Sequence, residues 1–263
     1  MEYGKYLKFF LALAPLLAAL CGSLPARSAE TAAGADEAKP AVQTVEDSLF
    51  LTRALRVDDP GSLRDAIAKG LSPNAVDGQG RPLLFAALME EAPKVAKMLI
   101  EQPGIDLEAQ TPTGETPLMA AAWRGNLEVV KLLVDGKSAE VNKPGWTALH
   151  YAAAQGHIEI VRYLLEQSAY IDAASPNGTT PLMMAARGGH IHVVKLLLDE
   201  GADLFLWNQR GLSAVDFAEL GNQAEIAQGL ASRWKKLEAL GMGKPKPQFD
   251  PKVLLPKVEA PKP

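Results

Sequence analysis

One phrase recurs along this chain, and its repetition constrains the fold more than any other feature. Residues 116–134 read TPLMAAAWRGNLEVVKLLV, residues 147–165 read TALHYAAAQGHIEIVRYLL, and residues 180–198 read TPLMMAARGGHIHVVKLLL. Alignment of the phrase places five residues in one column, at spacings of 34, 31, 33 and 33 residues: Pro82, Thr116, Thr147, Thr180 and Ser213. A unit of this length cannot bury its apolar face alone, so the pattern predicts a stack whose neighbouring units share one core.

Each phrase predicts two short helices joined by a turn. The Thr of the column can cap the first helix with its side-chain oxygen, and Pro117 and Pro181 follow where a missing N–H costs nothing. Gly125, Gly156 and Gly189 come where that helix must end in a left-handed backbone. Apolar residues then recur at helical spacing and predict the second helix.

These motifs identify the chain as similar to the ankyrin repeat family over roughly residues 45–230. The resemblance implies an all-α solenoid of stacked helix-turn-helix units with β-hairpin fingers between them. We count six units, with divergent end units at 45–80 and 212–230 that predict caps, because an internal unit at the end would expose apolar surface. The segment between Val134 and Thr147 is two residues shorter than its counterpart between Leu198 and Ser213, which predicts a short finger next to Trp146.

The segments outside the repeats have their own patterns. A basic start, an apolar run of 12 residues at 9–20 and small side chains at Ala26 and Ser28 predict a signal peptide over residues 1–28. Residues 29–44 predict a flexible linker. Residues 231–263 predict the end of a helix followed by a disordered tail rich in Pro and Lys.

The signal peptide predicts an exported protein, either of a bacterial periplasm or secreted, with no stable membrane insertion after cleavage. The apolar run is shorter than the about 20 residues that a membrane-spanning helix needs. An alternative is a lipoprotein anchored through Cys21, although Leu20 stands where a small residue is normally needed. Cleavage after Ser28 would leave a chain without cysteine, which suits an oxidising compartment.

Charge argues against nucleic acid as a partner. Residues 29–232 carry 16 Lys and Arg against 27 Asp and Glu, a net charge of −11. The basic residues gather instead after residue 232. The expected partner is another protein, exported or in the cell envelope, and the expected oligomeric state is a monomer.

No catalytic, cofactor-binding or metal-binding constellation is found in the sequence. The four histidines are His150, His157, His190 and His192. The resemblance implies a structural role for His150 beside Thr147, and His157 and His190 stand where a helix restarts after glycine. No carboxylate accompanies them at ligand spacing. We therefore expect no enzyme activity, no cofactor and no metal.

The family pattern implies binding through a concave surface made by the fingers and the first helices. The columns that core packing does not dictate hold the candidate partner-binding residues: Arg81, Met89, Glu90, Glu115, Trp123, Arg124, Trp146, Gln155, Thr179 and Arg187. Trp and Arg are enriched at binding hot spots. Trp123 and Trp146 are expected to form an aromatic patch flanked by Arg124 and Arg187, unless both rings simply pack against neighbouring units.

The leading hypothesis is a non-enzymatic protein-interaction module or scaffold that acts outside the cytoplasm. One alternative is an enzyme or small-ligand-binding protein that uses the groove. Another is a secreted effector or a toxin-neutralising protein.

Overall fold

The computed structural model describes residues 45–243, and these residues form six pairs of helices. The pairs are α2 (Val45–Arg56) with α3 (Pro60–Ala68), α4 (Leu83–Met89) with α5 (Pro93–Ile100), α6 (Pro117–Arg124) with α7 (Leu127–Lys137), α8 (Ala148–Gln155) with α9 (Ile158–Glu166), α10 (Pro181–Gly188) with α11 (Ile191–Asp199), and α12 (Ala214–Leu220) with α13 (Ala224–Ala239). The all-α solenoid and its six units are therefore confirmed. The predicted signal peptide, the linker at 29–44 and the tail from residue 244 lie outside the described residues.

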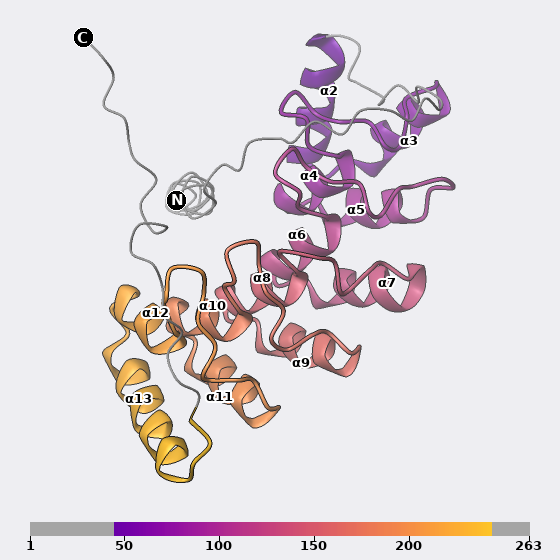
Figure 1. Cartoon of the computed structure of the whole chain (residues 1–263). Coiled ribbons are helices and arrows are strands. Elements are labelled where there is room, and N and C mark those ends of the chain that lie inside the picture. Colours follow the sequence, from indigo (N-terminus) through magenta and orange to yellow (C-terminus); the bar gives the residue numbers. More distant parts are fainter. Residues whose placement is uncertain (1–44, 244–263) are drawn as a thin grey trace, which may run out of the picture.

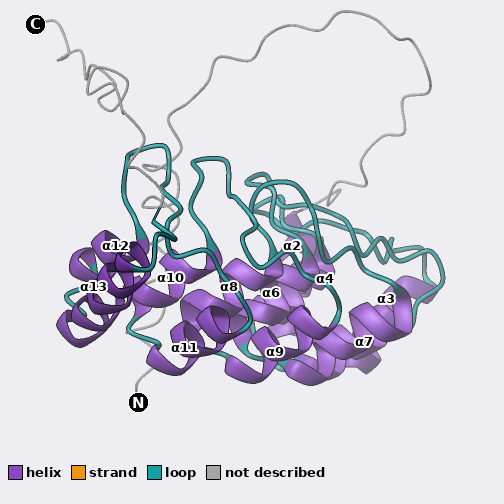
Figure 2. Cartoon of the chain, turned by 60° about the horizontal axis from the view of Figure 1, so that its bottom comes forward, coloured by secondary structure: helices purple, strands orange, loops and turns teal. Residues whose placement is uncertain are grey.

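The helices form two rows. Figure 1 shows the first helices of the units, from α4 to α12, following one another along one row, with the second helices from α5 to α11 in a second row beside it. The loops that precede the first helices project from one side of the stack in Figure 2. A continuous apolar core runs between the rows, and small residues of the first helices such as Ala121, Ala152 and Ala185 are fully buried in it. Small side chains let neighbouring units approach closely.

The ends of the first helices follow the expected chemistry. Thr116 and Thr180 accept hydrogen bonds from the N–H groups of Met119 and Met183, each at 3.4 Å. The hydroxyl of Thr147 differs, because it lies 2.9 Å from Nδ1 of His150. The glycines that end these helices are left-handed, with φ of 73° at Gly125, 77° at Gly156 and 80° at Gly189.

The fingers are tight turns rather than extended β-hairpins. The only β-bridge in the described part of the chain joins Val76 to Pro82. Four turns are each closed by a backbone bond: Asp77 N–H to Arg81 O, Thr111 N–H to Glu115 O, Ser175 N–H to Thr179 O, and Asn208 N–H to Leu212 O. At each turn the N–H of the last residue donates to the side chain of the first residue instead of its carbonyl: Arg81 to Asp77, Glu115 to Thr111, Thr179 to Ser175, and Leu212 to Asn208. The side chain thus replaces the second backbone bond of a hairpin pair, which explains the difference from the expected hairpins.

One column of side chains links each unit to the next. Side-chain oxygens of this column accept hydrogen bonds from backbone N–H groups one unit further on: Asn74 from Asp106, Glu108 from Glu140, Asn142 from Tyr170, and Asp172 from Asp203. Distances along the chain from this column to the next first helix locate the short finger. The segment from Asn142 to Thr147 is three residues shorter than the segment from Asp172 to Thr180. The α7 helix extends to Lys137, which makes up one residue of this difference.

The stack ends where this column changes from polar to apolar. Phe205 takes the place of the polar residue and is buried under Trp234 of α13, with ring centroids 4.6 Å apart. The ring centroid of Trp207 also lies 5.3 Å from that of Trp234. The α13 helix therefore continues past residue 230, where we ended the repeat domain from the sequence, because its second half covers the last finger. No helix among the described residues is both long and apolar enough to cross a membrane.

Candidate protein-binding face

The candidate residues lie along one face, which we call the finger face: the last residue of each finger and the C-terminal residues of each first helix. Its first half, around α4 and the last residue of α6, is charged. Its second half, around α6, the short finger and α8, is aromatic.

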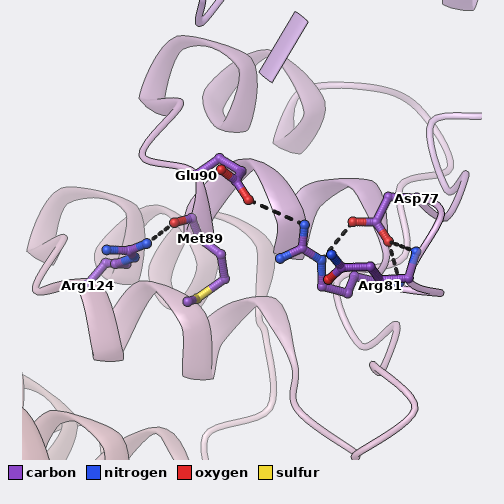
Figure 3. Close-up of polar contacts among 6 residues, drawn as sticks. Asp77, Arg81, Met89, Glu90 and Arg124 are labelled. Carbon is purple, nitrogen blue, oxygen red and sulfur yellow. Dashed lines mark hydrogen bonds and ion pairs between the residues drawn. The ribbon is translucent and has the colours of Figure 1, made fainter. Parts of the chain in front are cut away.

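The charged half is an ion-pair network (Figure 3). Nε of Arg81 lies 2.7 Å from Asp77 Oδ2, and its Nη2 lies 3.4 Å from Glu90 Oε1. Arg124 reaches back into the preceding unit, where Nη1 pairs with Glu91 at 2.8 Å and Nη2 donates to the backbone carbonyl of Met89. The arginines of this half are thus engaged within the domain.

The aromatic half is organised around Tyr151, a residue that the sequence columns did not select. The rings of Trp123 and Trp146 stand edge-on to Tyr151, with centroids at 6.0 Å and 6.3 Å and interplanar angles of 75° and 62°. Trp146 also meets the His150 ring at 5.2 Å. We call Trp123, Trp146 and Tyr151 the aromatic cluster. All three are partly exposed, and Trp123 and Tyr151 also pack against the core. The signal that could have revealed Tyr151 is its column, the fourth position after the capping residue, where α8 carries an aromatic ring and the neighbouring units carry Ala120 and Met184.

Two of the candidate side chains are not available to a partner. Thr179 is 1% exposed, because its finger packs against the next one: Gln209 donates from N–H and Nε2 to the carbonyls of Asn177 and Pro176. Met89 is 6% exposed, because every residue of α4 is buried between its neighbours. Thr179 and Met89 are therefore no longer candidate partner-binding residues. Glu90 is exposed, and Glu115, Gln155 and Arg187 are partly exposed on the finger face.

His150 is a structural residue between two units. Its Nε2 lies 2.9 Å from the carbonyl oxygen of Thr179, which can only accept, so Nε2 carries the proton. Nδ1 then accepts from the backbone N–H of Thr147 at 3.2 Å. Burial lowers the pKa of His150 to about 4, so the ring is neutral at physiological pH.

The other histidines near glycine also hold units together. Nε2 of His157 lies 3.0 Å from the carbonyl of Trp123, and Nε2 of His190 lies 2.9 Å from that of Ala154. Burial is the main cause that lowers the pKa of His190. Within residues 45–243 no three His, Cys, Asp or Glu residues are grouped so that they could hold a metal ion.

Comparison with known proteins identifies the repeat. A family model described as ankyrin repeats in three copies matches residues 83–175, and a single ankyrin repeat model matches residues 177–209. The domain is built of ankyrin repeats.

Several relatives share parts of this domain. Ankyrin repeat and SAM domain-containing protein 6 of Rattus norvegicus is 37% identical over 110 residues, which cover 40% of this chain and 12% of the relative. Notch-regulated ankyrin repeat-containing protein B of Danio rerio is 45% identical over 65 residues, 24% of this chain and 59% of the relative. Glycerophosphocholine phosphodiesterase gde1 of Schizosaccharomyces pombe is 32% identical over 112 residues, 42% of this chain and 10% of the relative.

These matches bear on the repeats and not on whole proteins. The chain covers less than two thirds of each of the three relatives, which all come from eukaryotes. They lend no support to a bacterial periplasm as the location. Two of the three are named for ankyrin repeats rather than for an enzyme activity.

Proposed function

We propose that this ankyrin repeat protein is a non-enzymatic interaction module that binds another protein through its finger face. Ankyrin repeats are typical protein-interaction modules, and the repeats carry this coarse assignment. The observation that supports the finger face is the aromatic cluster, because partly exposed Trp and Tyr side chains in a packed setting are the usual anchors of protein interfaces. Arg187 lies on the same face and makes no ion pair with any described residue.

We further propose that the protein acts outside the cytoplasm, in the periplasm or after secretion, and that its partner is an exported or envelope protein. This proposal rests on the sequence of residues 1–28 and on the absence of cysteine after Cys21. N-terminal sequencing of the protein from its native cells is expected to start at or near Ala29. Recovery of the uncleaved chain from the cytosol would contradict it.

No catalytic role is proposed. The match to the Schizosaccharomyces pombe phosphodiesterase covers only 10% of that enzyme. The buried histidine with the lowered pKa, His150, is held on both ring nitrogens by the backbone of its own domain. It therefore has no free nitrogen with which to act on a substrate.

The binding proposal is tested by capture of proteins from the cell envelope fraction with the mature chain and two variants. Trp146→Ala removes one member of the aromatic cluster. Lys195→Ala is the control, because Lys195 is exposed on α11 in the second row of helices. A partner that binds the wild-type chain and Lys195→Ala is expected to bind Trp146→Ala more weakly, by about 1–3 kcal/mol. Equal binding of all three proteins would contradict the proposed face.

A further inference from the structure

The aromatic cluster has a geometry that suits one chemical class of side chain. Its three rings come from separate segments, the end of α6, the short finger and α8, and the Tyr151 ring stands at a steep angle to each tryptophan ring. All three side chains are partly exposed. The face of an aromatic ring is negative, so several faces together attract a cation.

A carboxylate borders the same cluster. Glu115 ends the finger before that of Trp146, and its Oε2 accepts hydrogen bonds from the hydroxyls of Thr111 and Thr113. Its charge reaches Tyr151, because it adds to burial in raising the pKa of that phenol. Among residues 45–243 no ion pair involves Glu115.

Two basic side chains of this region, Arg124 and Lys143, are paired with other residues. The guanidinium of Arg124 is turned toward Met89 and Glu91 of the preceding unit. Nζ of Lys143, in the short finger, lies 2.8 Å from Glu108. Neither of these side chains is paired with Glu115, in a region whose net charge is −11 over residues 29–232.

We infer that Trp123, Trp146, Tyr151 and Glu115 together receive a positively charged side chain, a lysine or an arginine, that the partner protein presents. The inference rests on the proposed function and adds the chemistry of the group that is bound. The aromatic faces contact the charged group and its alkyl stem, and the Glu115 carboxylate balances the charge. An uncharged apolar anchor fits less well, because it would desolvate Glu115 without compensation.

The test uses a small cation and its uncharged carbon isostere: choline and 3,3-dimethylbutan-1-ol. Each is titrated into the mature chain, and the indole N–H signals of the four tryptophans are followed by NMR. Trp207 and Trp234 serve as internal references, because they pack with each other at the end of the stack. Choline is expected to move the signals of Trp123 and Trp146 saturably and to bind about fivefold more tightly than the isostere.

Glu115→Gln is the matched variant. Its amide oxygen still accepts from Thr111 and Thr113, so the finger keeps its turn while the charge is lost. The variant is expected to bind choline about threefold more weakly and the isostere unchanged. Equal binding of choline and isostere, no movement of the Trp123 and Trp146 signals, or an unchanged choline affinity in Glu115→Gln would overturn the inference.

The two proposals fail in different ways. If an envelope protein binds through Trp146 while choline shows no preference over its isostere, the cation site is wrong and the interaction face stands. If choline binds as expected while Trp146→Ala retains every captured protein, the cation site stands and the protein-binding face is wrong.

Discussion

The junctions between α4 and α6, between α6 and α8, and between α8 and α10 are each closed by a similar hydrogen bond, but from different residues. At each, a carbonyl near the end of a first helix accepts a hydrogen bond from the next unit: Met89 from Arg124, Trp123 from His157, and Ala154 from His190. The later junctions use a histidine that precedes the second helix. The first junction uses an arginine from the finger face.

The difference comes from a pair of substitutions that compensate each other. A Cβ at Gly156 would come within 2.3 Å of the His190 ring, and one at Gly125 within 2.5 Å of His157. Histidine therefore requires glycine in the preceding unit. In the first junction the shorter Asn126 caps α7 instead, by accepting from Val129 N–H at 3.1 Å, and Glu91 occupies the glycine column with φ of 58°.

This comparison changes the role that we assign to Arg124. We selected it from the sequence as a partner-binding residue, yet it supplies the donor that Asn126 does not. Its role at the junction is structural, whereas the aromatic cluster of the second half keeps partly exposed rings on the finger face.

The strongest test of the histidine junctions is Gly156→Ala. We expect a loss of about 2–5 kcal/mol in the free energy of unfolding, because the left-handed backbone is strained and the new Cβ overlaps His190. Urea denaturation measures it. Gly70→Ala is the control, since Gly70 has φ of 108° and a Cβ at this position would meet nothing within 4 Å, so only the backbone cost applies.

The double variant Gly156→Ala/His190→Asn gives the junction between α8 and α10 the asparagine of the first junction. It should recover part of the loss, because the overlapping ring is gone. A double variant as unstable as the sum of both single changes would show that glycine and histidine are not coupled in this way.

A pH titration distinguishes α8 from its neighbours, which carry Met119 and Met183 where α8 carries His150. Above pH 6.5 the His150 ring is neutral in the folded and the unfolded chain. As pH falls from 6.5 to about 4, the unfolded chain binds a proton that the folded chain does not. Stability should therefore fall by about 1.4 kcal/mol per pH unit from this group, about 3 kcal/mol in total.

His150→Met should remove that component, because methionine does not titrate and already fits the same column in α6 and α10. The measurement is the free energy of unfolding at several pH values for both proteins. An identical slope between pH 6.5 and 4 in the two proteins would contradict the assignment.

At the first junction, Arg124→Ala should cost about 1–3 kcal/mol, because the carbonyl of Met89 loses its side-chain donor. His157→Ala should have a similar effect at the next junction. Arg187→Ala is the control and should change stability by less than about 0.5 kcal/mol. If Arg124→Ala matches Arg187→Ala in stability, Arg124 is available for a partner after all.

The smallest effect is expected for Glu91→Gly. Glycine removes the strain of φ 58°, about 1 kcal/mol, but gives up the exposed pair with Arg124, which contributes about 0–1 kcal/mol. We expect a net gain below about 1 kcal/mol in chemical denaturation. Glu91→Ala loses the pair without relieving the strain, so it should be less stable than Glu91→Gly.

Local patterns predicted most of the fold. The cap at Thr116, the proline at 117 and the glycine at 125 each act within one helix, so their effect can be predicted from neighbouring residues. The resemblance to ankyrin repeats then implied how the units stack. The finger face could be listed by column, but the sequence could not tell which of its residues stay accessible, since some of them, such as Arg124 and Thr179, bond to a neighbouring unit.

The sequence by itself determined the six helix pairs, the repeat family and the short finger next to Trp146, because these follow from spacing along the chain. Only the tertiary structure decided which finger-face residues remain available. Thr179 is buried by the next finger, Arg124 is bound to Met89, and Tyr151 joins two tryptophans from other segments. The physical reason is that contacts between units depend on pairs of residues about 30 positions apart, whose sizes and charges compensate one another only in the stacked form.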